Sequence, residues 1–155
     1  MSTIYPIVEI FHSVQGEGFH AGIPHVFVRF GNCNLRCEWC DTDFLTYDER
    51  DTESIVEEVL SFDCKRVIFT GGEPAMQNLA LIGSKLKEHG IILSIETNGT
   101  IPIDPVIDWI CVSPKDQLYP NAKTVGRFSV VIFKEVTIFS LLLSISLPNL
   151  LVVGI

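Results

Sequence analysis

The sequence has few basic residues and no internal repeat. Eleven Lys and Arg stand against nineteen Asp and Glu in 155 residues, which gives a formal net charge of −8. A protein that binds nucleic-acid backbones needs basic surface to displace counterions, so this balance argues against that class. It does not exclude a small anionic substrate, because one Arg can bind a carboxylate. The length is that of one domain, and 47% hydrophobic residues are enough for a core.

The amino-terminal segment, Met1–Val8, lacks the pattern of a signal peptide. The cysteine count is odd, at five, and three of the cysteines are clustered, which does not suit the disulfide framework of a secreted protein. We therefore expect a cytoplasmic protein, in which clustered thiols indicate metal or catalytic chemistry.

The stretch Val136–Ile155 contains no charged residue. Three interpretations are open for it: a hydrophobic closing segment, a membrane anchor, or a shortened or frame-shifted end that does not belong to the fold. Pro148 and Asn149 interrupt the run and no cationic flank follows, which argues against an anchor. We favour a shortened chain.

Short apolar runs alternate with helical patterns between residue 5 and about residue 112. The expected strands are His25–Phe30, Arg66–Thr70, Ile91–Glu96 and Ile107–Val112, with one more possible within Gly126–Glu135. The expected helices are Thr52–Leu60, with Thr52 as its N-cap, and Asn78–His89, with Gly90 as its stop. Together they predict a parallel α/β sheet whose site lies at the carboxyl ends of the strands. The acidic run Asp48–Asp63 is interpreted as a solvated helix face.

Three cysteines, Cys33, Cys37 and Cys40, follow the first of these strands. A structural zinc site needs four protein ligands, and no His or Cys stands close enough in sequence to be the obvious fourth. Three thiolates suit a [4Fe–4S] cluster with one open iron, while a zinc site closed by a distant histidine is the alternative. Cys64 and Cys111 are expected to be core residues.

The spacing Cys-x3-Cys-x2-Cys after a β-strand resembles that of the radical S-adenosylmethionine (SAM) superfamily. Thr70–Pro74, read as Thr-Gly-Gly-Glu-Pro, resembles its Gly-Gly-Glu motif, although such a turn alone also occurs in ordinary loops. The resemblance implies an incomplete α/β barrel, a cluster on three cysteines and SAM on the fourth iron. It also implies a 5′-deoxyadenosyl radical as the reactive species, with no catalytic side chain beyond the cluster-bound cofactor.

Other motifs resemble those of the 7-carboxy-7-deazaguanine synthase family. They are Phe11–Gly18, Phe27–Cys37, Trp39–Thr42, Glu96–Gly99 and Ser113–Lys115. The resemblance covers about residues 5–120 of a single domain, 1–155, and leaves 121–155 unmatched. It implies a lyase of 7-deazapurine and queuosine biosynthesis that converts 6-carboxy-5,6,7,8-tetrahydropterin to 7-carboxy-7-deazaguanine with loss of ammonia. Mg²⁺, an electron donor such as flavodoxin or ferredoxin, and a homodimer are implied in the same way.

The same resemblance assigns the site residues. For SAM it implies Trp39, Cys40, Asp41, Gly72, Glu73, Ser113, Pro114 and Lys115, and for Mg²⁺ it implies Thr42. For the substrate it implies Val14, Gln15, Gly16, Glu17, Arg29 and Thr70, with Arg29 on the carboxylate. Simpler interpretations stay open, namely solvated charges for Arg29, Glu17 and Lys115 and a turn residue for Thr42.

Two alternatives to this function remain. A radical SAM activase would share the cluster but act on a protein partner with a glycyl loop. A non-catalytic metal-binding fragment would retain zinc or no metal at all. His12, His20, His25 and His89 are expected to be structural or exposed, because nothing in the sequence pairs them with a nucleophile.

Overall fold

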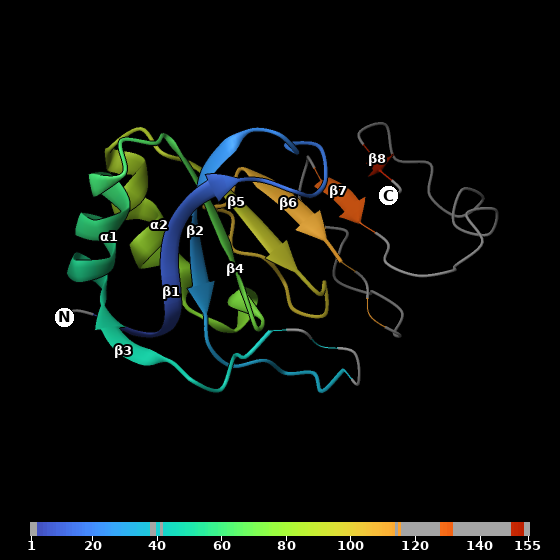
Figure 1. Ribbon diagram of the computed structural model, residues 1–155, viewed down its shortest axis with the longest axis horizontal. Helices are drawn as coiled ribbons and strands as arrows, with labels where there is room; N and C mark the ends of the chain where they lie inside the picture. Colours follow the sequence, from blue (N-terminus) through green and yellow to red (C-terminus); the bar gives the residue numbers. More distant parts are fainter. Residues whose placement is uncertain are drawn as a thin grey trace.

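The computed structural model describes residues 3–37, 40, 42–113, 115, 128–131 and 150–153. The strands form one eight-stranded sheet in the order β3-β1-β2-β4-β5-β6-β7-β8 (Figure 1). The elements in chain order are β1 (Ile4–Val14), β2 (Pro24–Phe30), β3 (Asp48–Asp51), α1 (Thr52–Ser61), β4 (Arg66–Gly71), η1 (Pro74–Met76), α2 (Leu79–Glu88), β5 (Ile92–Thr97), β6 (Trp109–Val112), β7 (Phe128–Val131) and β8 (Leu150–Val153). The predicted α/β class is confirmed.

The part of the sheet from β2 to β8 is parallel throughout. Strands β2, β4, β5 and β6 lie where the apolar runs predict them, and β7 lies inside the possible strand Gly126–Glu135. The described strands end at two edges, β3 and β8, that do not pair with each other, so the barrel is incomplete as expected.

The amino-terminal region adds two antiparallel strands that the sequence analysis did not predict. β1 pairs with β2 on one side and with β3 on the other. Pro6 and several polar residues interrupt the apolar alternation of β1, which hid the strand in the sequence. The interpretation of Asp48–Asp63 as one acidic helix face is therefore wrong at its start, because Asp48–Asp51 pairs with the backbone of β1.

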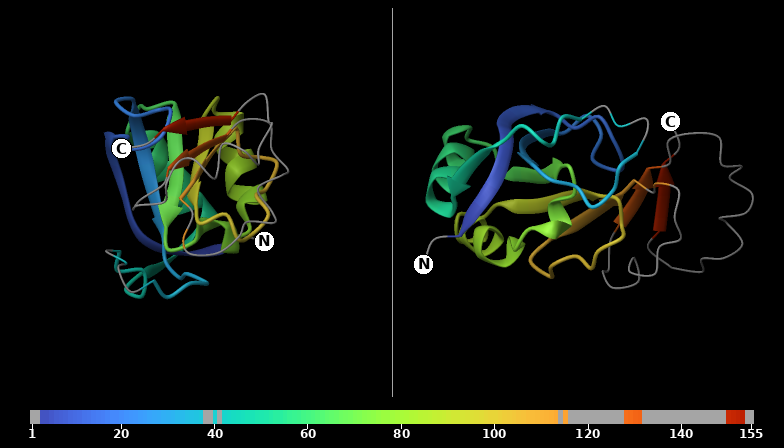
Figure 2. Two further views of the ribbon diagram at one scale, coloured as in Figure 1. Left: turned by 90° about the vertical axis from the view of Figure 1, so that its right-hand side faces the viewer. Right: turned by 90° about the horizontal axis from the view of Figure 1, so that it is seen from below.

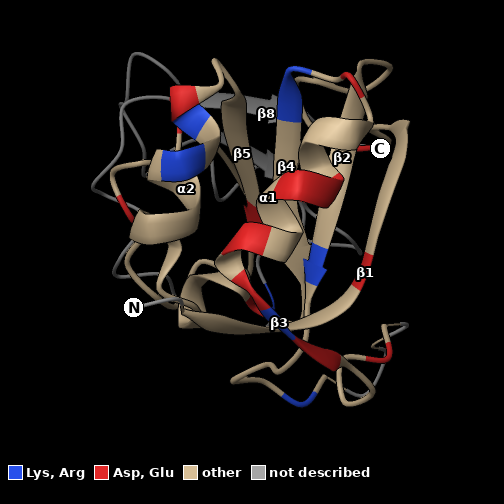
Figure 3. Ribbon diagram, turned by 90° about the vertical axis from the view of Figure 1, so that its left-hand side faces the viewer, with Lys and Arg blue, Asp and Glu red and all other residues tan. Residues whose placement is uncertain are grey.

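The two helices cover one face of the sheet (Figures 2 and 3). The N-cap of α1 is Asp51, whose Oδ1 accepts from the Ser54 N–H at 2.8 Å, and not Thr52 as predicted. Thr52 is the first helical residue, and its N–H and hydroxyl both donate to the Thr3 carbonyl oxygen at 3.1 Å. α2 ends before Gly90, whose φ of 72° allows the turn that was predicted there.

Side chains of the parallel strands alternate between the two faces of the sheet. One set packs against the helices in a single buried cluster and includes Val26, Val28, Phe30, Val67, Phe69, Leu93, Ile95, Ile110 and Val112. The residues between them, among them Arg29, Thr70 and Glu96, belong to the opposite face. This division gives the sheet an apolar face for folding and a second face that is available for chemistry.

Part of the uncharged carboxyl-terminal stretch belongs to the sheet. Leu150–Val153 forms β8 and pairs in parallel with β7, whereas the sequence analysis favoured an end that lies outside the fold. Most of segment 121–155 lies outside the described residues. Within the described part of the chain, no helix has the length and apolar character needed to cross a membrane.

Candidate functional site

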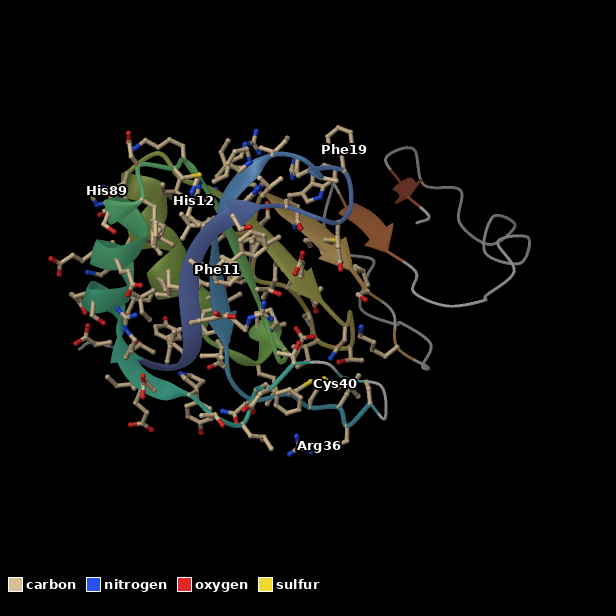
Figure 4. The ribbon with its side chains drawn as sticks, viewed as in Figure 1. Phe11, His12, Phe19, Arg36, Cys40 and His89 are labelled. Carbon is tan, nitrogen blue, oxygen red and sulfur yellow. The ribbon has the colours of Figure 1, made fainter. Side chains whose placement is uncertain are left out.

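A cavity of about 940 Å³ lies on the sheet face opposite the helices and extends to the carboxyl ends of the strands. The loop that carries the cysteines closes one side of it, and Cys40 lies beside these strand ends (Figure 4). Most of the predicted site residues line the cavity, namely Val14, Gln15, Gly16, Glu17, Arg29, Cys33, Cys37, Cys40, Thr42, Thr70, Gly72, Ser113 and Lys115. Trp39, Asp41 and Pro114 lie outside the described residues.

Two glycines allow the end of β4 to approach the start of the cysteine loop. Gly71 has a φ of 119°, which favours glycine, and Gly72 lies so close to the Asn32 carbonyl that a Cβ there would overlap it. The Gly72 N–H donates to the Phe30 oxygen at 3.0 Å, and the Glu73 N–H donates to the Asn32 oxygen at 2.9 Å. The Gly-Gly pair therefore fixes where the cysteine loop begins.

The three clustered thiols share one cavity wall. Burial raises the pKa of the Cys33 thiol, while the Leu35 N–H, which lies 3.4 Å from Sγ, lowers it. Among the described residues, no three His, Cys, Asp or Glu side chains converge as ligands of one metal ion. A four-iron cluster does not need that convergence, because each cysteine binds a different iron. The donor set therefore fits such a cluster.

A glutamate to which the sequence analysis gave no role stands at the centre of the polar wall. Gln15 Nε2 donates to Glu96 Oε1 at 2.8 Å, and Thr70 Oγ1 donates to Oε2 at 2.7 Å. Gln15 Oε1 in turn accepts from the Glu17 N–H at 3.1 Å. Glu96 belongs to the Glu-Thr-Asn-Gly motif at the end of β5, and this motif was the sequence signal that could have identified it as a site residue. These groups form a linked hydrogen-bonding surface built from the residue after β1 and from strands β4 and β5.

Arg29 also faces the cavity, on β2. Its Nε donates to Glu9 Oε1 at 2.7 Å, and Glu9 lies directly opposite it on β1. Sequence reasoning missed Glu9, because a cross-strand pair leaves no spacing signal when one of the two strands is not predicted. Arg29 is 24% exposed, so it is neither a fully solvated nor a buried cation.

Glu73 follows the two glycines and is the N-cap of η1. It is fully buried and is not among the residues that line the cavity. Ala75 N and Thr97 Oγ1 donate to its Oε1 at 2.9 and 2.8 Å, and Asn98 N donates to its Oε2 at 2.7 Å. Burial raises its pKa, and these donors oppose the shift. In this structure the carboxylate of Glu73 joins η1 to the end of β5, and its contact with SAM stays a prediction.

The remaining predicted ligands also line the cavity. Lys115 Nζ donates to Ser113 Oγ at 2.9 Å, and the Ser113 N–H donates to the Thr97 oxygen at 2.9 Å. Thr42 precedes a turn in which Asp43 Oδ1 accepts from the Leu45 N–H at 3.0 Å, so the turn role considered for this segment belongs to Asp43. Thr42 itself lines the cavity together with Cys40.

Comparison with known proteins identifies the class of the chain. The family model of the radical SAM superfamily matches residues 27–136. The chain is thus a radical SAM protein, and membership of that superfamily implies a [4Fe–4S] cluster and SAM as cofactors.

Individual relatives narrow the class further. The 7-carboxy-7-deazaguanine synthase of Neisseria meningitidis is 47% identical over 112 residues, which cover 72% of this chain and 53% of that protein. The one of Bacteroides thetaiotaomicron is 39% identical over 137 residues, which cover 88% of this chain and 75% of that protein. A crystal structure of QueE from Escherichia coli matches with a TM-score of 0.71 and 25% identity, covering 83% of this chain and 70% of that one.

These matches show that the chain belongs to the 7-carboxy-7-deazaguanine synthase family. The chain spans about half the length of the Neisseria relative, 53%, and three-quarters of the Bacteroides relative.

Proposed function

We propose that the protein converts 6-carboxy-5,6,7,8-tetrahydropterin to 7-carboxy-7-deazaguanine in queuosine biosynthesis. The observation that carries the proposal is one cavity lined by three thiols, a linked set of hydrogen-bonding side chains and a guanidinium group. Substrate and product differ by ammonia alone, so the reaction has no net demand for electrons and a reductant serves only to start it.

The polar wall suits the pterin ring. A pterin presents amide-like donors and acceptors in one plane, and the side chains of Gln15, Thr70 and Glu96 already form a linked set of such groups. Val14, Gly16 and Glu17 adjoin this set and complete the substrate contacts that we propose. Arg29 binds the substrate carboxylate, because a guanidinium matches carboxylate geometry.

The cysteine loop and the strand ends suit the cofactors. Cys33, Cys37 and Cys40 hold the [4Fe–4S] cluster, and Thr42 contributes a hard oxygen ligand to Mg²⁺. SAM contacts come from the Gly72 backbone and from the pair Ser113 and Lys115, and we extend them to Trp39, Asp41 and Pro114 from the sequence alone. When bound, the cluster and SAM supply the one-electron chemistry that starts the reaction.

The charge of the cavity agrees with a cationic cofactor. Among the described residues, four carboxylates, those of Glu9, Glu17, Asp43 and Glu96, line it together with two cations, Arg29 and Lys115. This net negative charge attracts the sulfonium ion of SAM. It repels a carboxylate, which therefore needs a cation close to it. An electron donor of the flavodoxin or ferredoxin type and assembly as a homodimer complete the proposal.

Anaerobic reconstitution with iron and sulfide tests the proposal, with Cys37→Ala as the variant and Cys64→Ala as the control. Cys64 approaches the backbone oxygens of Pro24 and Arg66 and is not among the cavity-lining residues, so its loss should not affect the cluster. We expect about four irons per chain in the wild type and in Cys64→Ala, and not in Cys37→Ala. Addition of SAM and the carboxytetrahydropterin should then yield 5′-deoxyadenosine and the deazaguanine. Zinc retained in place of a cluster would refute the proposal.

The Arg29→Ala variant distinguishes the proposed enzyme from an activase. The proposed enzyme loses affinity for the carboxylated pterin in this variant. An activase has no substrate carboxylate to lose, and its SAM cleavage would depend on a protein partner instead.

A further inference from the structure

Glu9 forms a contact that the proposed chemistry does not use. It lies opposite Arg29 in the antiparallel β1–β2 pair, just after a register shift between Ile7 and Glu9. Glu9 Oε1 accepts from Arg29 Nε at 2.7 Å, and both residues line the cavity. Since cross-strand neighbours share one face of a sheet, the bulge sets which β1 side chain meets Arg29.

A second contact holds the guanidinium from another direction. The Arg29 Cζ lies 5.8 Å from the centre of the Phe11 ring. The Phe11 ring is itself stacked on Phe27, with a centroid distance of 5.0 Å and an interplanar angle of 5°. Arg29 therefore has a stacked aromatic support and a carboxylate partner on the same pair of strands. Figure 4 shows Phe11 on β1, the strand that also carries Glu9.

Which donors of Arg29 remain for a ligand depends on the atom that Glu9 takes. A guanidinium can bind a carboxylate side-on, through Nε and one Nη, or end-on, through both Nη atoms. Glu9 occupies Nε, which removes the side-on mode and leaves the end-on mode. A carboxylate shortened by one methylene would not reach Nε from the same backbone position.

We propose that Glu9 is a positioning residue that holds Arg29 by its Nε, so that both Nη atoms are presented to a carboxylate in the cavity. Glu9 thereby sets the preference for a carboxylated pterin over an uncharged one. This inference rests on the proposed function, in which Arg29 binds the substrate carboxylate. The competing hypothesis is charge competition: the negative charge of Glu9 repels the carboxylate of the substrate and weakens its binding.

Two conservative variants separate position from charge. Glu9→Gln keeps an oxygen acceptor at the same reach and removes the charge, whereas Glu9→Asp keeps the charge and withdraws the acceptor. Glu9→Ala removes both. If Glu9 positions Arg29, the preference for the carboxylated pterin is preserved in Glu9→Gln and lost in Glu9→Asp and Glu9→Ala. If charge competition dominates, this preference becomes stronger in Glu9→Gln and Glu9→Ala.

The measurement is anaerobic binding of two ligands to the reconstituted protein by calorimetry: 6-carboxy-5,6,7,8-tetrahydropterin and the tetrahydropterin without the carboxylate. We expect the ratio of the two affinities to fall about tenfold in Glu9→Ala and Glu9→Asp, and to stay within about threefold of wild type in Glu9→Gln. Affinity for the uncharged ligand should not change. Thermal unfolding and cluster absorbance of each variant show that the comparison is made between folded, loaded proteins.

An unchanged or increased ratio in Glu9→Ala overturns the inference, as does a loss in Glu9→Gln equal to that in Glu9→Asp. Arg29→Ala identifies a failure at the earlier step. If the wild type and Arg29→Ala show the same ratio, the proposed carboxylate contact is wrong, and the inference falls with it.

Discussion

Replacement of Glu73 by alanine should destabilise the fold strongly, although the residue belongs to a motif expected to bind a ligand. Its side chain is fully buried, and its two oxygens accept three hydrogen bonds, from Ala75, Thr97 and Asn98. Alanine leaves these donors without their acceptor. A buried group that loses its partner costs about 1–3 kcal/mol, and water that enters the space recovers part of this. We expect a loss of about 3–5 kcal/mol in the free energy of unfolding.

Glutamine at the same position gives a graded test of the reasoning. One end of its amide can still accept, but the NH₂ group then faces either the Asn98 N–H or the Ala75 N–H, which are both donors. One hydrogen bond is lost instead of three, so we expect a loss of about 1–3 kcal/mol for Glu73→Gln. The exposed Glu57 on α1 provides a matched control, and Glu57→Ala should stay within about 0.5 kcal/mol of wild type.

The assay is urea unfolding of the cluster-free protein, followed by circular dichroism, with the slope of the transition compared among variants. The cluster-free state is used so that cofactor binding does not contribute to stability. If Glu73→Ala and Glu73→Gln unfold at the same urea concentration as wild type, the structural role assigned to this carboxylate is refuted.

Two further predictions concern the cysteine loop and the pH dependence of stability. Gly72→Ala should lower the iron bound per chain after reconstitution, because the new Cβ would overlap the Asn32 carbonyl, while Gly16→Ala has open space and should bind iron normally; equal iron contents would contradict this. Burial lowers the pKa of the fully buried His25. Below about pH 6.5 the unfolded chain therefore binds a proton more readily than the folded chain, and the free energy of unfolding decreases as the pH decreases. His25→Phe should reduce this loss when melting temperatures are compared between about pH 7.5 and about pH 5.5, and an unchanged pH dependence would contradict it.

The parallel strands were predictable because burial on both faces leaves a simple pattern. β2, β4 and β5 are nearly continuous apolar runs that stop at glycine or at polar motifs, and their ends meet at one edge of the sheet. That rule alone was sufficient to bring the cysteines, Thr70 and Ser113 to one cavity. Sequence reasoning therefore found the wall that the strand ends build.

The antiparallel strands were not predictable in the same way. β1 contains Pro6 and polar residues on its cavity side, so its pattern has neither a clean alternation nor an apolar run. Missing β1 meant missing Glu9, since its role follows only from its register with Arg29. The cap of α1 was misplaced by one residue for a related reason: Asp51 and Thr52 are both good caps, and the pairing of β3 with β1 decides between them.

The two glutamates at the strand ends show what motif matching leaves undecided. Glu73 comes two residues after β4 ends, where the chain turns into η1, and its carboxylate is directed to the donors of Ala75, Thr97 and Asn98. Glu96 lies within β5, so the alternation of the strand places it on the cavity face. Both residues occur in motifs that resemble those of the family, and their position relative to the strand end decides which of the two lines the cavity.

For the binding of a carboxylate in the cavity, the orientation of the Arg29 guanidinium matters more than its charge. The described residues that line the cavity include more carboxylates than cations, so their average field opposes an anionic ligand. Lys115 contacts Ser113 just after β6, whereas the Arg29 guanidinium is the cation on the β1–β2 wall. A carboxylate can bind there only through short, directional hydrogen bonds that outweigh the unfavourable field. The position of two Nη atoms, fixed by Glu9 and Phe11, then decides whether those bonds form.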